Sequence, residues 1–303
     1  MIHNMYKTPT KRITTFLERV IPSLYERYGT FLFNRYRDFK YKKVIEEQIN
    51  DFYRNKPLFR HVEIETINRC NNVCSFCPVN KHADSREFKK MEEALFYKII
   101  DELEAINYDG VVALHSNNEP LLDERLSTFI TYARKKLPKA KLIIFTNGIL
   151  LTKEIFHILI ENMDEIVIDN YHDDLKLVKP VQAIYDYIVS DHNLYELAKK
   201  KLKIDLRKQN EILTSRGGSS PNRRNVTALK CSCYLPFNQM VIRPDGKISL
   251  CCNDALGKFT LGDLNQQSMT EVWNSDEYNK MRDLIRQGRD KISICKNCDT
   301  LLV

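Results

Sequence analysis

The sequence predicts an α/β protein in which helices cover a parallel β-sheet. Between residues 61 and 208, short apolar segments alternate with longer segments whose apolar residues recur every three or four positions. Most of the short segments are continuous apolar runs, which is typical of strands buried on both faces of a parallel sheet. Polar and sulfur-containing residues follow these runs. Ligands bind at that edge of such sheets, so this is where we expect the chemistry.

Five strands and four helices account for the alternation. The strands are rich in β-branched residues, and the helices carry their apolar residues on one face. Thr152 is a suitable N-cap for the third helix, because its hydroxyl can accept a hydrogen bond from the first turn. The predicted strands are 61–67, 110–116, 140–148, 164–170 and 202–208, and the predicted helices are 91–106, 123–137, 152–163 and 177–201.

The pattern changes after residue 209. Residues 210–230 are rich in Gly, Ser, Asn and Arg without periodicity, which predicts a loop or linker. Residues 238–252 alternate around Pro-Asp-Gly and predict a β-hairpin, and residues 269–288 predict a helix. We therefore expect an N-terminal helical segment, a central α/β domain and a small C-terminal hairpin-and-helix domain. Their expected bounds are 1–58, 59–215 and 216–303.

The net charge of +7 is concentrated near the N-terminus. Residues 1–60 hold 13 Lys and Arg against 6 Asp and Glu, and the rest of the chain is neutral. Aromatic residues at helical spacing within residues 10–56 favour a pair of helices packed on the main domain. The alternative is a basic amphipathic element that contacts a membrane surface, an anionic substrate or a partner. Neither interpretation favours nucleic-acid binding.

Composition excludes several classes of protein. The chain has no run of 18 apolar residues, so we expect no membrane span, and the N-terminus lacks the apolar core of a signal peptide. We therefore expect a cytoplasmic location, where thiols stay reduced. The nine cysteines are odd in number and clustered, with none between 78 and 230. This pattern indicates metal binding or catalysis rather than disulfides.

The first cysteine group reads CNNVCSFC and supplies three thiols, Cys70, Cys74 and Cys77. Thiolates bind zinc or iron–sulfur clusters. A closed zinc site needs four ligands, so a distant cysteine would have to complete it. The other interpretation is a [4Fe–4S] cluster held by three cysteines, with one iron left open for a small molecule.

This C-x3-C-x2-C motif, in a loop after the first strand, resembles that of the radical S-adenosylmethionine (radical SAM) enzymes. The resemblance implies a partial (β/α)5–6 barrel over residues 60–210, with Phe76 as the aromatic residue usual between the last two cysteines. It implies that the open iron binds S-adenosylmethionine, whose cleavage gives a 5′-deoxyadenosyl radical that abstracts a substrate hydrogen. An external donor such as a flavodoxin or ferredoxin would supply the electron.

Other positions extend the resemblance. The Gly-Gly-Glu-Pro motif of the family corresponds here to residues 117–120, in which both glycines are asparagine. Residues 146–148 match a turn common after the third strand. On the fourth strand Val167 stands where many members have a serine, so that serine's ribose contact is not expected. The resemblance implies cofactor contacts from Phe76, Asn117, Asn118, Glu119, Asn147 and Asp169.

The C-terminal region resembles the auxiliary-cluster domains of the same family, called SPASM and, in a shorter form, twitch. Gly246 and Cys251 fit their C-x(9–15)-G-x4-C signature, with Cys233 or Cys231 in front. The resemblance to twitch implies one auxiliary [4Fe–4S] cluster, so the chain would hold two clusters in all. Its ligands would be Cys233, Cys251, Cys295 and Cys298. Cys231 or Cys252 could replace its neighbour as a ligand, or donate a hydrogen atom to a substrate radical, and Cys252 is the favoured donor.

Twitch enzymes suggest two outcomes on a carbon that bears a hydroxyl. After hydrogen abstraction, the substrate radical can lose a proton and an electron to give a ketone. If a thiol instead returns a hydrogen atom to the opposite face of the radical, the product is an epimer. Arg207 and Arg216 stand where family members place polar groups for the substrate or the cofactor carboxylate. We therefore expect an oxidoreductase or epimerase that acts on a sugar, an aminocyclitol or a related small polar metabolite. Maturation of a ribosomal peptide and a non-catalytic iron–sulfur or zinc protein are the alternatives.

Overall fold

One curved sheet organises the protein. The computed structural model describes residues 2–3, 30–223, 226 and 229–301. Its strands are β1 (Ile2–His3), β2 (His61–Ile64), β3 (Val111–Ala113), β4 (Lys141–Thr146), β5 (Glu165–Tyr171), β6 (Leu202–Arg207), β7 (Gln239–Ile242) and β8 (Ile248–Ser249). They lie in the order β1-β6-β5-β4-β3-β2-β7-β8, and only β7 and β8 pair antiparallel. The predicted partial (β/α) barrel is confirmed.

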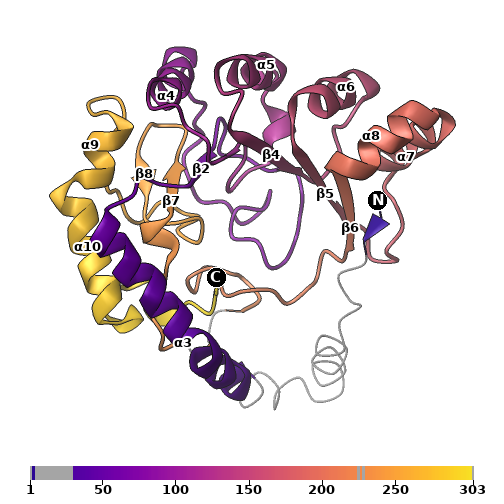
Figure 1. Cartoon of the computed structure of the whole chain (residues 1–303). Coiled ribbons are helices and arrows are strands. Elements are labelled where there is room, and N and C mark those ends of the chain that lie inside the picture. The colour runs from indigo at the N-terminus through magenta and orange to yellow at the C-terminus, as the bar shows by residue number, and fades with distance from the viewer. Residues whose placement is uncertain (1, 4–29, 224–225, 227–228, 302–303) are drawn as a thin grey trace.

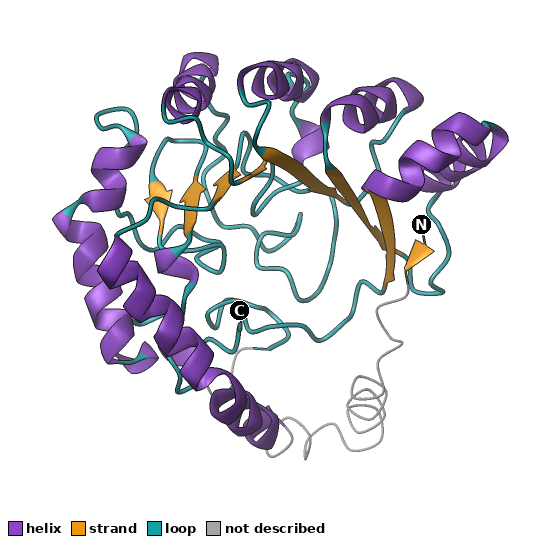
Figure 2. Ribbon diagram, in the orientation of Figure 1, coloured by secondary structure: helices purple, strands orange, loops and turns teal. Residues whose placement is uncertain are grey.

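Helices cover the outer face of the sheet and flank one end of it. Among the described residues, α4 (Glu93–Ala105), α5 (Leu126–Lys136), α6 (Lys153–Asn162), α7 (Lys179–Ser190) and α8 (His192–Lys201) lie on the outer face. At the end of the curve, beyond β7 and β8, lie α3 (Thr30–Asn55), α9 (Met269–Asn274) and α10 (Asp276–Gln287) (Figure 1). Figure 1 shows α4 to α8 along the outside of the curve, and Figure 2 shows loops gathered on its inner side. Two predicted helices are split: Asp191 caps α8 through the N–H of Leu194, and Ser275 caps α10.

The main core lies between the sheet and the outer helices. Phe96 of α4 stacks on Phe129 of α5 with ring centroids 4.1 Å apart. Phe156 of α6 is also fully buried. Burial of each such side chain contributes about 1.5–3 kcal/mol. The strand residues Val62, Val112, Leu142, Ile144, Ile166 and Ile204 are also completely buried. This apolar layer fixes the strand order that brings the carboxyl ends of the strands together.

The C-terminal hairpin extends the central sheet. β7 pairs in parallel with β2, with Val62 opposite Met240, and β8 folds back on β7. The predicted Pro-Asp-Gly turn is confirmed: Gly246 has a φ of +82° and donates its N–H to the carbonyl of Arg243 over 2.9 Å. A positive φ of this kind favours glycine. The hairpin therefore places Ser249 level with Glu63 of β2, because both residues pair with Val241.

Helix α3 packs along the C-terminal part of the chain. Phe52 lies edge-on to Trp273, and the buried guanidinium of Arg282 lies 4.1 Å from the Trp273 ring. The predicted packing of aromatic helical residues within 10–56 is confirmed for α3, and residues 10–29 of that segment fall outside the described residues. β1 was not predicted and pairs in parallel with β6. Although α3 has 26 residues, neither it nor any other described helix is long and apolar enough to cross a membrane.

Candidate active site

The carboxyl ends of β2 to β6 surround one cavity of about 320 Å³. Its volume is in the range of small-molecule sites. Twelve predicted site residues line it: Cys70, Cys74, Phe76, Cys77, Asn117, Asn118, Glu119, Asn147, Asp169, Arg207, Arg216 and Cys252. The structure therefore brings together residues that are up to 182 positions apart in the sequence. The other four predicted ligands, described below, do not line the cavity.

The first three cysteines lie in a loop braced by Asn80. The Asn80 side chain donates to the carbonyls of Cys74 and Cys77 over 3.0 and 2.9 Å, and the N–H of Asn72 points at the Cys70 sulfur over 3.4 Å. Burial raises the pKa of the Cys70 thiol to about 12. An uncoordinated thiol would thus be protonated, and iron is what would hold it as a thiolate.

Glu119 joins the loops that follow β3 and β4. Its carboxylate accepts hydrogen bonds from the Thr146 hydroxyl over 2.6 Å and from the Asn147 N–H over 2.7 Å. The Asn147 side chain donates in turn to the Asn71 side chain, next to Cys70, over 2.7 Å. Burial raises the pKa of Glu119 to about 7. The Asn-Asn-Glu-Pro loop, the Thr-Asn-Gly turn and the cysteine loop therefore form one bonded unit.

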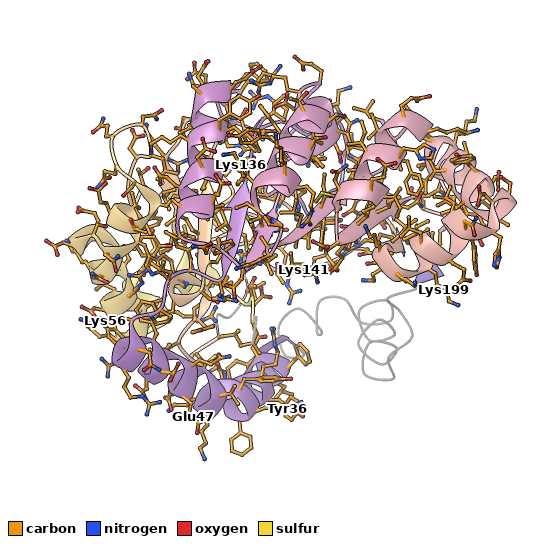
Figure 3. All side chains as sticks on the ribbon, turned by 45° about the horizontal axis from the view of Figure 1, so that its top comes forward. Tyr36, Glu47, Lys56, Lys136, Lys141 and Lys199 are labelled. Carbon is orange, nitrogen blue, oxygen red and sulfur yellow. The ribbon has the colours of Figure 1, made fainter. Side chains whose placement is uncertain are left out.

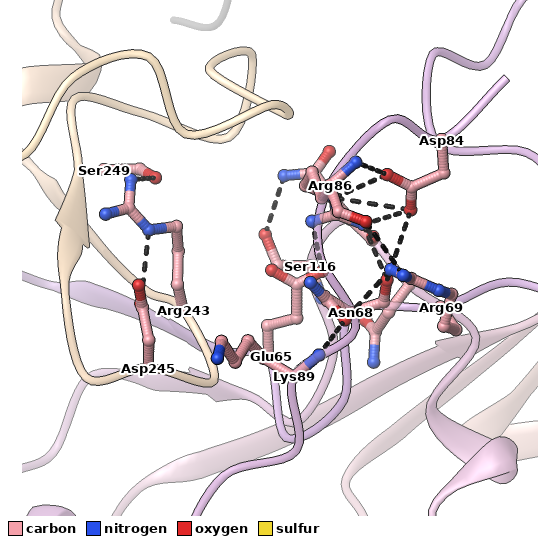
Figure 4. A network of polar contacts seen from close by, with 12 residues as sticks. Glu65, Asn68, Arg69, Asp84, Arg86, Lys89, Ser116, Arg243, Asp245 and Ser249 are labelled. Atoms are coloured by element: carbon pink, nitrogen blue, oxygen red, sulfur yellow. Dashed lines mark hydrogen bonds and ion pairs between the residues drawn. The ribbon is translucent and has the colours of Figure 1, made fainter.

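Arg86 holds the same unit from outside the cavity (Figure 4). Its guanidinium pairs with Glu65 over 3.0 Å and with Asp84 over 2.9 Å, and it donates to the carbonyls of Asn68 and Asn117 over 3.1 and 3.0 Å. One side chain thus links the end of β2, the start of the cysteine loop and the start of the Asn-Asn-Glu-Pro loop. Arg86 was not predicted, because it lies in an irregular segment without a recognisable motif.

Arg207 and Asp169 form the opposite wall. Arg207 pairs with Asp169 over 3.2 Å and with Glu211 over 3.1 Å. Its guanidinium also lies 6.0 Å from the ring of Phe76 and 5.7 Å from that of Tyr171, a cation–π geometry. Burial raises the pKa of Asp169 even though Arg207 opposes the shift. Arg207 therefore fixes the predicted cofactor-side residues Phe76 and Asp169.

Arg216 and Cys252 meet at the C-terminal side of the cavity. Arg216 has a φ of +50° and donates from Nη2 to the side-chain oxygen of Asn117. The Arg216 Nε is buried and has no hydrogen-bond partner. Asn117 donates to the carbonyl of Cys252 over 3.2 Å, and burial raises the pKa of the Cys252 thiol. An unpaired donor and a protonated thiol thus face the same space.

Glu63 adds a carboxylate that the sequence analysis missed. The Glu63 oxygens accept hydrogen bonds from Ser116 over 2.6 Å and from Gln239 over 2.5 Å, and His61 lies 3.5 Å away. Burial alone would raise its pKa, but the hydrogen bond and charge of His61 and the hydrogen bond of Ser116 lower it. The signal in the sequence was weak, because Glu63 is one of two acidic residues in the predicted strand 61–67. Glu63 therefore presents an ionised carboxylate to the cavity.

His115 is a neutral part of the same wall. Burial lowers the pKa of His115 to about 4, and its ring stacks on Phe145 with centroids 4.6 Å apart. The Phe145 N–H donates to Nδ1 of His115 over 3.1 Å. The ring thus carries no charge to neutralise Glu63 near neutral pH.

The remaining cysteines gather beside the cavity. Burial raises the pKa of Cys251 well above its usual value, with smaller contributions from Cys252, Cys233, Cys298 and Cys295. Those contributions are electrostatic and fall with distance, so the four predicted ligands lie near one another. Among the described residues, which include every cysteine, no three His, Cys, Asp or Glu converge on a single metal ion. Cluster ligands bind separate irons and need no such convergence.

Cys231 is also in contact with α3. The Asp38 carboxylate of α3 accepts the Cys231 N–H over 2.9 Å. Burial, together with that carboxylate, raises the pKa of the Cys231 thiol. The buried Arg289 donates to the Cys231 carbonyl over 2.9 Å. These contacts support the prediction that Cys233, rather than Cys231, belongs to the ligand set.

The polar lining of the cavity fits a bound cofactor. The side-chain nitrogens of Asn72 and Asn118 are buried without a hydrogen-bond partner, as is the Arg216 Nε. Buried donors rarely remain unpaired, so these three atoms indicate that a polar ligand completes the site. The three cysteines and these donors together fit an iron–sulfur cluster with S-adenosylmethionine.

Comparison with known proteins identifies the domains. Residues 64–207 match the radical SAM superfamily, and residues 231–299 match SPASM, an iron–sulfur cluster-binding domain. A curated relative is the S-adenosyl-L-methionine-dependent 2-deoxy-scyllo-inosamine dehydrogenase of Niallia circulans. It is 28% identical over 247 residues, which are 81% of this chain and 95% of the relative.

Solved structures give the same result. BtrN in complex with AdoMet and 2-DOIA has a TM-score of 0.68 and 27% identity, over 81% of this chain and 94% of that one. Streptococcus suis SuiB bound to the precursor peptide SuiA has a TM-score of 0.54 at 12% identity, over 84% of this chain and 74% of that one, which shows a shared fold alone. The two domain matches imply [4Fe–4S] clusters and S-adenosylmethionine as cofactors. The chain is a radical SAM enzyme: it belongs to the radical SAM superfamily and carries a C-terminal SPASM iron–sulfur domain.

Proposed function

We propose that this enzyme oxidises a secondary alcohol of an aminocyclitol, or of a closely related sugar-like metabolite, to a ketone. The observation that carries the proposal is the match to an aminocyclitol dehydrogenase over 95% of that protein's length. The cavity supports it, because an ionised carboxylate and a free guanidinium donor line its walls. A small molecule with hydroxyl and ammonium groups would satisfy both.

The proposal assigns the cofactor side to residues from β2 to β6. Cys70, Cys74 and Cys77 would hold the first cluster, and Cys233, Cys251, Cys295 and Cys298 the auxiliary one. When bound, these groups and S-adenosylmethionine supply a radical that abstracts hydrogen and an acceptor for one electron. Asn117, Asn118, Glu119, Asn147, Asp169 and Phe76 would surround S-adenosylmethionine. Arg207 would keep Asp169 and Phe76 in place through its ion pair and ring contacts.

The substrate side consists of Glu63 and Arg216. The Glu63 carboxylate can accept hydrogen bonds from a hydroxyl or an ammonium group, and it is already oriented by Ser116 and Gln239. The unpaired Nε of Arg216 can donate to a substrate oxygen. The ketone requires loss of the hydroxyl proton, and Glu63 is the ionised carboxylate on the wall that can receive it. Both residues would therefore orient the carbon that is oxidised.

Epimerisation is the second candidate, and one observation favours it. Cys252 lines the cavity, and burial raises its pKa, so its thiol remains protonated and can donate a hydrogen atom. Peptide maturation has weaker support, because the likeness to the peptide-bound structure is one of fold alone.

A substrate panel tests the proposal. Reduced, reconstituted enzyme should form 5′-deoxyadenosine with 2-deoxy-scyllo-inosamine or a related aminocyclitol, together with a product two mass units lighter. Glu63→Gln should raise the KM for an amino substrate by about tenfold or more, because a buried charge-assisted hydrogen bond is lost. Glu104→Gln, at a surface ion pair, should change nothing. Turnover of a peptide but of no small alcohol would overturn the proposal.

The cellular setting follows from the same chemistry. Both clusters and free thiols require reducing conditions, so we propose a cytoplasmic enzyme that receives its electron from a flavodoxin or ferredoxin. The bounds 1–58, 59–215 and 216–303 also remain proposals for the domain division.

A further inference from the structure

The first half of α3 presents its side chains in an unusual order. The buried positions are polar, with Asn34 exposed by 1% and Asp38 by 9%. Leu32, Tyr36 and Phe39 are exposed by 67%, 58% and 88%. A helix that packs on a globular domain normally buries its apolar face. This half of α3 does the reverse.

Polar contacts fix that orientation. Asp38 accepts the N–H groups of Lys230 and Cys231 over 2.7 and 2.9 Å. Arg37 donates to the carbonyl of Asp299 over 2.8 Å. Rotation of the helix to bury Phe39 would break these bonds beside the auxiliary-cluster cysteines. The aromatic face is therefore held outward by the protein's own contacts.

The second half of α3 is conventional. Ile45, Ile49 and Phe52 are exposed by at most 6% and pack into the core. Glu46 and Glu47 point outward and pair with Lys42 and Lys43. Figure 3 shows Tyr36 and Glu47 on the side of α3 that faces away from the sheet. Except for Val44, which is exposed by 42%, the exposed large apolar residues of α3 thus lie in its N-terminal half.

The outward face combines aromatic and basic residues. Leu32, Tyr36 and Phe39 follow one another at i, i+4 and i+7, and Lys40 and Lys43 continue the same face. Residues 30–43 carry five Lys and Arg against one Asp. Phe31 and Phe33 flank the stripe and are exposed by 43% and 42%. Aromatic and aliphatic side chains flanked by lysines are typical of helices that lie on an anionic bilayer.

This face lies outside both matched domains, which span residues 64–207 and 231–299. The stripe residues do not line the cavity. Its chemistry therefore serves something other than the cofactors or the substrate described above.

We propose that the outer face of α3 docks on an anionic membrane surface. Leu32, Tyr36 and Phe39 enter the headgroup region, and Lys40 and Lys43 lie beside lipid phosphates. Each lysine near an anionic leaflet contributes about 1 kcal/mol, and burial of the three apolar side chains adds to that. The protein thus attaches reversibly by one helix, while the cavity remains inside the barrel.

Vesicle sedimentation with the full-length holoenzyme tests this under anaerobic conditions. The enzyme should sediment with phosphatidylcholine vesicles that contain about 30% phosphatidylserine, and not with pure phosphatidylcholine. The binding should fall about tenfold or more when the salt concentration is raised well above the physiological value. A variant with Leu32→Ser, Tyr36→Ser and Phe39→Ser should lose about tenfold or more of the binding. Val189→Ser, at an equally exposed apolar site on α7, should bind like the wild type.

Iron content and 5′-deoxyadenosine yield should be unchanged in all variants, which shows that they are folded. Failure of the wild type to bind anionic vesicles would overturn the proposal. Equal binding by the triple variant would overturn it too. A wild-type dimer that the triple variant turns into a monomer, without vesicle binding by either, would assign the face to a second copy of the chain instead.

Discussion

The backbone N–H of Asn147 donates to the carboxylate of Glu119 over 2.7 Å, which ties the turn after β4 to the loop after β3. The same carboxylate accepts the Thr146 hydroxyl, and the Asn147 side chain reaches Asn71 beside Cys70. The residues expected around S-adenosylmethionine are thus one hydrogen-bonded unit that also includes the cysteine loop. A substitution at Glu119 should therefore alter both the loop after β3 and the turn after β4.

Glu119→Gln should weaken S-adenosylmethionine binding by about tenfold or more, because an amide replaces a carboxylate that accepts charge-assisted and backbone hydrogen bonds. Iron content should stay close to that of the wild type. Equilibrium binding to the reconstituted enzyme measures the effect, with Glu93→Gln, at the start of α4, as the control. Unchanged affinity would remove Glu119 from the cofactor site.

Replacement of Cys70, Cys74 and Cys77 together by Ala should remove one cluster and leave the other. Reconstituted wild type should hold about eight irons per chain and the variant about four, since each [4Fe–4S] cluster carries four. Cleavage of S-adenosylmethionine should be lost completely. Iron analysis and electron paramagnetic resonance check both points, and zinc in place of iron would contradict the cluster assignment.

Cys231 and Cys233 form a matched pair of variants. Cys233→Ala should reduce the iron content by up to about four, because a ligand of the auxiliary cluster is lost. Cys231→Ala should keep the full iron content, since Cys231 is held beside α3 through its N–H bond to Asp38. The reverse result would show that the two cysteines exchange roles.

Arg86→Gln should lower the free energy of unfolding by about 3–5 kcal/mol, because it leaves the buried Glu65 without its cation and Asp84 with Arg69 alone. It should also weaken S-adenosylmethionine binding, since the carbonyl of Asn117 loses its donor. Arg60→Gln removes an exposed ion pair with Asp109 and should cost about 1 kcal/mol or less. Urea unfolding under anaerobic conditions compares the two. Similar losses in both variants would contradict the role given to Arg86.

Much of the site was predictable because its residues follow local patterns. Apolar runs in the sequence predict the strands, and the residues that follow the strands must meet at one edge of a parallel sheet. This is why Cys70, Glu119, Asn147 and Arg207 were expected together and were found around one cavity.

The rest depends on contacts that no local pattern encodes. β7 pairs with β2 across about 180 residues, and the hairpin pattern alone does not specify that partner. Asn34 and Asp38 are buried because Asp38 accepts hydrogen bonds from the N–H groups of Lys230 and Cys231. The first half of α3 therefore buries polar side chains, whereas its sequence pattern predicts a buried apolar face. Arg86 links residues 65–68 with Asn117, and its own neighbourhood in the sequence carries no signal of those contacts.

The most direct test of the central claim is turnover of an aminocyclitol in deuterated water. Oxidation predicts a ketone two mass units lighter than the substrate, one 5′-deoxyadenosine per ketone, and no solvent deuterium at the reacting carbon. An alcohol of inverted configuration that carries one solvent deuterium on carbon would contradict the dehydrogenase and assign the hydrogen donor to Cys252.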